Sequence, residues 1–335
     1  MSAVAVVGAG SWGTTLADLL GRKGCDARLW ALEAEVAAAV NERRENPVYL
    51  PGFRLDERVR ATTALADAVA DADVVVSVSP AQHVRRVMAA AAGAMRPDAL
   101  VVSASKGIEK VTLCTMAGVL REVLPAGARD RAVFLSGPSF AREVAAEQPT
   151  AVTAASSAPD AARAAQALFQ TGYFRVYTSG DVEGVELGGA LKNVIAVAAG
   201  MSSGLGLGHN ALAALMTRGL AEISRLGIKL GANPLTFAGL AGMGDLILTC
   251  TGELSRNRSV GYALGQGRKL DEILAGMTMV AEGVDTTRAA YQLARREGIE
   301  MPIVDVVHAV LFGNMHPRDA VESLMLREPK PELWR

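Results

Sequence analysis

Short apolar segments and longer helical stretches alternate along the first half of the chain. The apolar segments are rich in valine and alanine, and Ala- and Leu-rich stretches of helical pattern separate them. This alternation is typical of β-α units and predicts a parallel sheet with helices on both faces. The expected strands are residues 4–7, 26–30, 73–77, 99–104 and 132–135. A strand over 150–155, a helix over 159–170 and a last strand over 174–177 complete this half.

From Asp181 onward the pattern becomes helical, with long runs punctuated by glycine and few β-branched segments. The expected helices are residues 184–199, 210–226, 233–240, 270–274, 286–297 and 302–311. The sequence therefore predicts an α/β domain with a doubly wound parallel sheet over residues 1–178, followed by an all-helical domain over 179–335. No low-complexity linker separates them. We expect the two domains to pack directly together, with a ligand cleft between them.

A glycine-rich turn follows the first expected strand. Gly8, Gly10 and Gly13 have the spacing G-x-G-x-x-G and precede a helix expected over residues 14–20. In a Rossmann-type domain the first glycine permits a tight turn, the second lets a pyrophosphate approach the backbone, and the third allows close packing of helix on strand. The alternative is a glycine turn of purely structural use. The strand before it and the helix after it favour a dinucleotide site.

The residue that follows the second strand bears on which dinucleotide is bound. Glu33 comes shortly after Trp30, where an acidic side chain would bind the adenosine ribose and a basic one would favour a 2′-phosphate. This favours NADH over NADPH. Two alternatives stay open: Glu33 is a solvated residue at a helix entry, or Arg43 or Arg44 reaches the phosphate.

Charge and composition exclude several classes of protein. Lys and Arg total 34 against 35 Asp and Glu, and the basic residues are scattered, so no binding surface for nucleic acid or an anionic membrane is expected. We find no basic leader and no apolar run of about 18 residues, so neither a signal peptide nor membrane insertion is expected. Three cysteines without CxxC spacing argue against a disulfide framework and a zinc site. These features predict a cytoplasmic protein without a metal site.

Two loops that follow expected strands carry groups suited to a ligand. Lys106 lies just beyond the apolar run that ends at Val102, and the loop 135–141 offers small residues whose amides could approach a ligand. In a doubly wound sheet such strand ends face the ligand crevice. By themselves these residues leave open a plainer reading, an exposed lysine and a Gly-Pro turn.

The helical half holds the other candidate residues. Lys192 and Asn193 lie in the middle of an apolar helix, where a lysine is rarely buried without a partner. The alternative is that the lysine stem packs while its head reaches water. Asp245 stands alone in a glycine-flanked apolar stretch, followed by Ser255-Arg256-Asn257-Arg258. That cluster concentrates donors suited to a phosphate monoester, because arginine binds phosphate through two parallel hydrogen bonds.

Taken together, these segments resemble the NAD(P)-dependent glycerol-3-phosphate dehydrogenase family of bacterial type, over most of the chain from Gly8 to Glu282. The most specific motifs are Ser-Gly-Pro-Ser-Phe-Ala at 136–141, Leu-Lys-Asn-Val at 191–194, Gly-x-Gly-Asp-Leu at 242–246 and Arg-Asn-Arg at 256–258. The resemblance implies a Rossmann-type domain joined to a helical domain. It also implies an oxidoreductase that interconverts dihydroxyacetone phosphate and sn-glycerol 3-phosphate with NAD or NADP, for glycerophospholipid synthesis. A homodimer through the helical domain stays open.

The resemblance further implies roles for individual residues. Lys192 would be the general acid and base, with Asp245 beside it and Lys106 as a third catalytic group. The cofactor contacts would be Gly8, Gly10, Ser11, Trp12, Gly13, Glu33, Tyr49, Lys106, Ala141, Arg256, Val280 and Glu282. The substrate contacts would be Lys106, Gly137, Ser139, Lys192, Asn193, Asp245, Thr249, Ser255, Arg256 and Asn257.

The chemistry expected from these residues agrees with that family. A hydride would pass from the nicotinamide to the carbonyl carbon while the Lys192 ammonium protonates the developing alkoxide. Asp245 would hold the ammonium, and Lys106 would lower the pKa of Lys192. Two rivals stay open: a dehydrogenase acting on a hydroxy acid or ketoacid, and a cofactor-binding regulator without turnover.

Two positions depart from the family pattern. Similar proteins often have a basic residue just after the second strand, where this chain has Leu32 and Glu33, and many have an acidic residue in place of His209. The first departure puts a 2′-phosphate contact in doubt. We assign no chemistry to His209.

Overall fold

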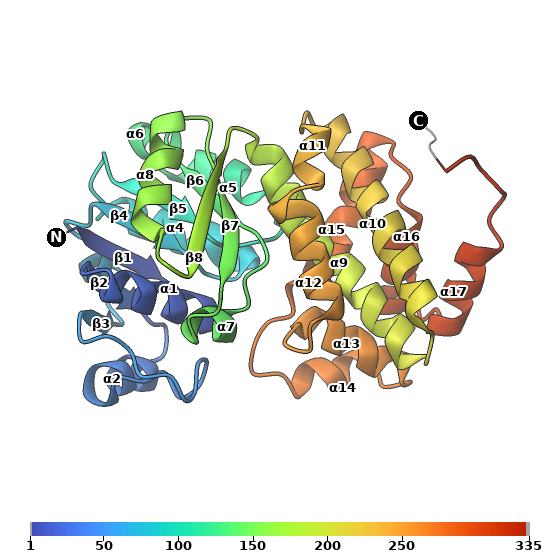
Figure 1. Cartoon of the computed structure of the whole chain (residues 1–335), viewed down its shortest axis with the longest axis horizontal. Helices are drawn as coiled ribbons and strands as arrows, with labels where there is room; N and C mark the ends of the chain where they lie inside the picture. Colours follow the sequence, from blue (N-terminus) through green and yellow to red (C-terminus); the bar gives the residue numbers. More distant parts are fainter. Residues whose placement is uncertain (1, 333–335) are drawn as a thin grey trace.

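The structure is a computed structural model that describes residues 2–332. An eight-stranded sheet forms the N-terminal half and a bundle of helices forms the C-terminal half (Figure 1). The strands are β1 (Ala3–Val7), β2 (Asp26–Trp30), β3 (Val59–Thr62), β4 (Val74–Ser77), β5 (Leu100–Ser103), β6 (Val133–Ser136), β7 (Thr150–Ala155) and β8 (Phe174–Ser179).

Short helices connect these strands. They are α1 (Ser11–Arg22), α2 (Ala34–Arg43), α3 (Leu65–Val69), α4 (Ala81–Ala92), α5 (Met116–Val123), α6 (Ala126–Arg129), α7 (Ala141–Ala145) and α8 (Pro159–Phe169). The strand order is β3-β2-β1-β4-β5-β6-β7-β8, and the first six strands are parallel. This is the Rossmann-type arrangement, which confirms the predicted fold class. The order reverses between β1 and β4, so the ligand crevice lies beyond their carboxyl ends.

One feature of the sheet differs from the prediction of a parallel sheet. β7 runs antiparallel to β6, and β8 then runs parallel to β7. The link between β6 and β7 contains only the five-residue α7. A five-residue helix is about 7 Å long, too short to cover the sheet along a strand of about 20 Å as a crossover helix does. The absence of a full-length crossover helix accords with the antiparallel pairing. β3 was also not predicted, because Val59–Thr62 is too short for its alternating pattern to be distinctive.

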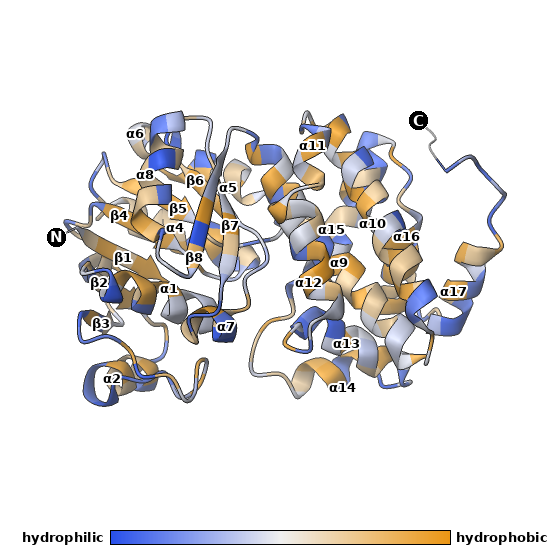
Figure 2. Ribbon diagram, in the orientation of Figure 1, coloured by the Kyte–Doolittle hydropathy of each residue, from blue (hydrophilic) through white to orange (hydrophobic). Residues whose placement is uncertain are grey.

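The helical half is built around α9 (Val182–Gly204), which is buried along nearly its whole length. A helix that is apolar on all sides is stable only inside a bundle. The helices around it are α10 (His209–Lys229), α11 (Pro234–Phe237), the π-helical turn η1 (Leu240–Gly244), α12 (Asp245–Thr251), α13 (Arg256–Gly265), α14 (Leu270–Ala275), α15 (Glu282–Glu297), α16 (Pro302–Phe312) and α17 (Pro317–Met325). Figure 2 shows apolar residues along the inner helices and polar ones on α17 at the periphery.

Three helical segments depart from the expected pattern. The helix predicted over 233–240 is only the four-residue α11, because the chain continues as the π-helical turn η1. Neither α13 nor α17 was predicted, since the polar starts of both resemble loops. The boundary at residues 178 and 179 stays a prediction.

One stretch has the length and composition of a membrane-crossing helix. Pro234–Thr251 has a mean hydropathy of 1.2, so the expectation that no apolar run of this length exists is wrong for these residues. In the structure the stretch is divided into α11, η1 and α12. It also carries Asp245, whose side chain is buried against α9 through Lys192.

Candidate functional site

The glycine turn lies at the carboxyl end of β1, where the strand order reverses. Gly8 has φ +126°, in the region that favours glycine, and it packs against the backbone of Val78 beyond β4. A Cβ on Gly13 would lie 1.9 Å from the Gly8 carbonyl oxygen, so only glycine fits there. A Cβ on Gly10 would meet no atom within 4 Å. The turn therefore leaves open space at the α1 N-terminus, where Ser11 begins the helix.

Asn46 supports this turn, and the sequence analysis missed it. Its buried side-chain amide donates to the Ala9 carbonyl oxygen and the Thr14 hydroxyl oxygen, both at 2.8 Å. Its own oxygen accepts the Tyr49 amide at 3.1 Å. An asparagine before a proline is common in turns, and nothing in the neighbouring sequence indicates the contact of Asn46 with a loop 37 residues away.

Trp12 lies beside the turn but directs its ring to the core. The ring packs against Phe174, with 6.3 Å between the two centroids. A contact from Trp12 to a cofactor would therefore be made by its backbone amide.

Glu33 and Tyr49, expected separately near the adenosine, are brought together. The Tyr49 hydroxyl donates to Glu33 Oε1 at 2.9 Å. Glu33 is the N-cap residue of α2, directly beyond β2. Both side chains are only partly buried, so this pair stands at the surface of the crevice edge.

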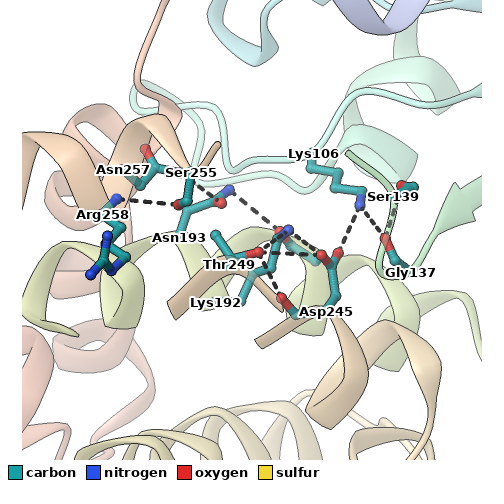
Figure 3. A network of polar contacts seen from close by, with 11 residues as sticks. Lys106, Gly137, Ser139, Lys192, Asn193, Asp245, Thr249, Ser255, Asn257 and Arg258 are labelled. Carbon is teal, nitrogen blue, oxygen red and sulfur yellow. Dashed lines mark hydrogen bonds and ion pairs between the residues drawn. The ribbon is translucent and has the colours of Figure 1, made fainter. Parts of the chain in front are cut away.

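Lys106, Lys192 and Asp245 converge on one point from three distant parts of the chain (Figure 3). Lys106 Nζ donates to Asp245 Oδ2 at 2.7 Å and to the Gly137 carbonyl oxygen at 3.0 Å. Lys192 Nζ donates to Asp245 Oδ1 and, at 2.8 Å, to the Thr249 hydroxyl oxygen. Lys192 is 7% exposed and Asp245 is 1% exposed. The Lys192 head therefore does not reach bulk water, which removes the alternative left open by the sequence.

Close backbone packing makes this convergence possible. Gly188 of α9 lies against η1, so a Cβ there would come 2.6 Å from the Ala241 carbonyl oxygen. Gly189 lies against the Lys106 stem and Ser136. Single π-helical turns often occur at functional sites, and η1 delivers Asp245 at the first residue of α12.

Burial and charge shift the ionisation of the pair in a definite direction. Burial and, less strongly, the positive charge of Lys106 lower the pKa of Lys192 against the opposing effect of Asp245, and the resulting pKa is about 8. Burial alone would raise the pKa of Asp245, but Lys106 and Lys192 together hold it below its ordinary value. The site therefore has a charged carboxylate beside a lysine that can lose its proton near neutral pH.

The predicted phosphate cluster lies at the start of α13. Ser255 is the N-cap residue, and its hydroxyl oxygen accepts the Arg258 amide at 3.2 Å. Asn257 donates to Asn193 Oδ1 at 2.8 Å and accepts the Gly283 amide at 2.9 Å. These buried side chains join α13 to α9 and α15. Arg256 is exposed instead, and its guanidinium makes no hydrogen bond among residues 2–332.

The remaining predicted residues lie on loops and helix starts. Ser139 donates to the Gly137 carbonyl oxygen at 3.0 Å, and Ala141 begins α7 and accepts the Thr15 hydroxyl at 3.2 Å. Glu282 begins α15 and accepts the Ala81 amide at 3.0 Å, which links the helical half to the start of α4. Val280 is exposed on the preceding loop. His209 is exposed at the start of α10 and joins none of these groups.

Other possible sites are distinct from this one. A cavity of about 590 Å³ lies among α9, α10, α16 and α17, and no predicted site residue lines it. Within the described residues, no group of three His, Cys, Asp or Glu is arranged to hold a metal ion. All three cysteines are free thiols.

Comparisons with known proteins agree on one family. The family model described as NAD-dependent glycerol-3-phosphate dehydrogenase N-terminus matches residues 3–162, and the corresponding C-terminus model matches residues 181–322. A glycerol-3-phosphate dehydrogenase (NAD(P)+) of Geobacter sulfurreducens is 58% identical over 331 residues, covering 99% of both chains. That of Citrifermentans bemidjiense is 57% identical, covering 98% of both chains. The crystal structure of glycerol-3-phosphate dehydrogenase from Coxiella burnetii has a TM-score of 0.93 at 36% identity, covering 97% of this chain and 99% of that one.

Proposed function

The chain belongs to the NAD-dependent glycerol-3-phosphate dehydrogenase family, and from this premise we propose that it interconverts dihydroxyacetone phosphate and sn-glycerol 3-phosphate. The observation that carries the proposal is the convergence of Lys106, Lys192 and Asp245 beside the glycine turn's crevice. A carbonyl reduction needs one proton donor at the oxygen and a positive environment for its developing charge. Both are present in this cluster.

The glycine turn fits a dinucleotide pyrophosphate. Gly10 faces open space, and the first amides of α1 are not used by an acidic side chain, because the first turn of α1 contains none. A helix N-terminus of this kind attracts an anion. Gly8, Gly10, Ser11, Trp12 and Gly13 would hold the pyrophosphate through their backbone. The nicotinamide of the bound cofactor supplies or accepts the hydride.

The adenosine end of the cofactor site favours NAD over NADP. Tyr49 orients the Glu33 carboxylate, which would bind the ribose hydroxyls and repel a 2′-phosphate. Arg44 is directed elsewhere, since its Nη1 donates to the Val59 carbonyl oxygen at 2.9 Å. Arg43 is the last residue of α2, at the far end of a ten-residue helix from Glu33, about 15 Å away.

Lys192 is the proton donor in the direction of reduction. Asp245 fixes its ammonium, and Thr249 accepts a second hydrogen bond from it, so the remaining N–H is available to a substrate oxygen. Lys106 is held by Asp245 and Gly137, and its positive charge favours the alkoxide form of that oxygen. Asp245 therefore positions both lysines and keeps their charges together in a buried site.

Arg256 is the main phosphate ligand in this proposal. Its guanidinium is exposed and unpaired at the α13 N-terminus, whose amides add further donors. The side chains of Asn193 and Asn257 are hydrogen-bonded to each other and would hold α9 and α13 in position. A side-chain N–H that this contact does not use would be available to the substrate. Ser255 caps the helix and would contact substrate only through its hydroxyl proton.

The other predicted contacts surround this centre. Gly137 and Ser139 would line the substrate, while Ala141, Val280 and Glu282 would contact the cofactor. A cytoplasmic location, supply of glycerol 3-phosphate to phospholipid synthesis and a homodimer through the helical half are further parts of this proposal.

One assay tests substrate and cofactor together. NADH and NADPH oxidation should be followed with dihydroxyacetone phosphate, with ketoacids and dihydroxyacetone as controls. We expect turnover with dihydroxyacetone phosphate alone and a higher kcat/KM with NADH. Turnover of a ketoacid at comparable kcat/KM would reject the substrate, and equal kcat/KM with both cofactors would reject the role of Glu33.

A further inference from the structure

A small cavity with both polar and apolar residues in its lining lies beside the Lys106 stem, between the sheet and α9. Its volume is about 10 Å³, and its lining includes Ser103 at the end of β5, Ser136 at the end of β6 and Glu186 in α9. These three residues are 1%, 5% and 8% exposed. The volume is close to the least that holds one water molecule.

The two serine hydroxyls have no partner in the described protein. Neither Ser103 Oγ nor Ser136 Oγ makes a hydrogen bond, although both are buried. Buried hydroxyls are nearly always hydrogen-bonded, because leaving one unpaired costs its full desolvation. A water molecule in the cavity would have two hydroxyls and a carboxyl group as partners, which is the number that buried waters ordinarily use.

Glu186 is anchored where it can serve this cavity. Its Oε2 accepts the Ala117 amide at 2.6 Å, in the first turn of α5. Burial raises the pKa of Glu186 to about 8, although hydrogen bonds from the Ala117 amide and the Thr115 side chain favour the charged form. In its protonated form the carboxyl group can donate a hydrogen bond. Glu186 thus links α9 of the helical half to both the α5 N-terminus and the cavity.

The cavity lies where backbone pairing between two strands ends. β5 and β6 are paired only at Val102 with Val133 and at Ser103 with Phe134. Beyond these pairs, Lys106 follows Ser103 and Gly137 follows Ser136, and Lys106 Nζ donates to the Gly137 carbonyl oxygen. The separation of the two strand ends therefore sets the position of the Lys106 ammonium.

We propose that one buried water molecule, bound by Ser103, Ser136 and Glu186, joins the ends of β5 and β6 to α9, and that Glu186 is thereby a positioning residue for Lys106. The kinetic part of this inference rests on the proposed function, since it assumes that Lys106 acts on the substrate. The water site itself does not depend on the identity of the substrate.

Thermal stability tests the water site without any assay of activity. Ser77 is the matched control, because its hydroxyl is also buried and unpartnered at a strand end but does not line the cavity. Removing an orphaned hydroxyl is neutral or stabilising, whereas removing one that holds a water is destabilising. We expect Ser103→Ala and Ser136→Ala to lower Tm and Ser77→Ala to leave it unchanged or raise it. Equal effects at all three serines would overturn the proposal.

A crystal structure of the wild-type protein supplies the direct observation. We expect ordered density for one water within about 3.2 Å of Ser103 Oγ, Ser136 Oγ and a Glu186 oxygen. A well-ordered cavity without such density would also overturn the proposal. If dihydroxyacetone phosphate is not turned over, these two experiments still decide the water site.

Kinetics separate positioning from structural support. A small misplacement of a catalytic group can cost about 100-fold in rate, so we expect Glu186→Ala to lower kcat about 10- to 100-fold with the KM for NADH unchanged. Glu186→Gln keeps the acceptor and a donor and should restore kcat to within about threefold of wild type.

The matched control is Glu222→Ala. Glu222 is also a buried carboxylate, accepts the Ile303 amide at 2.8 Å and lies outside the site. It should lower Tm and leave kcat unchanged.

Three outcomes would reject Glu186 as a positioning residue: wild-type kcat in a folded Glu186→Ala, no rescue by glutamine, or an equal loss of kcat in Glu222→Ala. If Glu186→Ala does not fold, Ser136→Ala tests the same point. It should lower kcat about threefold or more by the same misplacement of Lys106, and unchanged kcat would reject the proposal.

Discussion

At the scale of single residues, the site depends on two lysines sharing one buried carboxylate. Burial opposes the charges of Lys192 and Asp245, and the contacts of Asp245 with Lys106 and Lys192 offset that cost. Burial and the positive charge of Lys106 lower the pKa of Lys192 below that of an ordinary lysine, so its ammonium gives up a proton more readily.

Removing the Lys192 ammonium should abolish the proton transfer while sparing the distant cofactor turn. Positioned general acids contribute about 10²- to 10⁴-fold, so Lys192→Ala should lower kcat by that factor with an unchanged Kd for NADH. Steady-state kinetics and fluorescence titration check the two parts. Lys229→Ala, at an exposed lysine ending α10, is the control. Near-normal turnover in Lys192→Ala would show that the acid lies elsewhere.

The pKa of about 8 for Lys192 gives the pH dependence a direction. Reduction needs the protonated lysine, so its kcat should fall as pH rises through about 8. Oxidation needs the neutral lysine, so its kcat should rise over the same range. Rates in both directions between pH 6 and 10 test this. Parallel pH profiles for the two directions would contradict it.

Arg256 should act mainly on substrate binding. A phosphate far from the reacting carbon serves as a handle, and hydrogen bonds to a charged group contribute about 1.5–3 kcal/mol each. Arg256→Ala should therefore raise the KM for dihydroxyacetone phosphate at least about tenfold, and Arg256→Lys should be intermediate because it keeps the charge without the planar fork. A selective loss of NADH binding would instead assign Arg256 to the cofactor.

At the scale of elements, α9 and α13 cross at a contact made by glycines. A Cβ on Gly200 would lie 2.0 Å from the Arg258 carbonyl oxygen, and one on Gly261 would lie 1.9 Å from that of Val197. Their backbones touch because both helices lack side chains at this point. The contact fixes Lys192, on α9, relative to Arg256, at the start of α13.

Adding a methyl group at this crossing should force the helices apart. Gly200→Ala is expected to destabilise the fold by about 1–3 kcal/mol through overpacking, and to lower kcat/KM in the folded fraction. Urea unfolding measures the first effect. Gly93→Ala is the matched control, because Gly93 at the end of α4 has φ −71° and no atom near its Cβ position. Equal stability of the two variants would show that the crossing can adjust.

At the scale of the whole molecule, buried carboxylates tie the parts together at helix starts. Glu282 accepts an amide at the start of α4, Glu186 one in the first turn of α5, and Glu222 one at the start of α16. The first two cross between the sheet and the helical half. Burial raises the pKa of each of the three, to about 7 or 8. Ionisation of these buried carboxyl groups should therefore lower the stability of the fold as the pH rises.

Glu222 allows this pH dependence of stability to be tested, since it lies away from the functional site. Burial raises the pKa of Glu222 from 4.5 to about 7, and Asp305 contributes to the rise. Two α16 amides and Arg225 oppose it. A raised folded-state pKa contributes stability that is full below about pH 4.5 and is lost as the pH passes 7. The loss amounts to roughly 3 kcal/mol. When the free energy of unfolding in urea is compared at pH 5 and pH 8.5, Glu222→Gln should not show this loss of stability.

The control for that experiment is Glu272→Gln, at an exposed position of α14. It should follow the wild-type dependence on pH. If Glu222→Gln also follows it, the Glu222 carboxyl group does not titrate in this range in the folded protein.

Features that depend on neighbours along the chain could be predicted from the sequence. Gly8, Gly10 and Gly13 could be recognised because turn, strand and helix propensities are local, and the alternation of elements predicted the parallel sheet for the same reason. The motif Leu-Lys-Asn-Val around Lys192 indicated the family of the chain, because it resembles the motif of that family. No residue had to be located in space for these inferences.

The contacts between groups far apart in the sequence depend on the folded structure. Asp245 joins Lys106 across 139 positions and Lys192 across 53, and Glu33 is paired with Tyr49. β7 runs antiparallel to β6, with only the five-residue α7 between them, and the pattern of its own residues does not reveal this direction. Asn46 and Glu186 were missed because a polar side chain carries no sequence signal of the backbone amide or carbonyl it will meet. Such partners are set by packing of the folded chain, since burial makes each unpaired polar group costly.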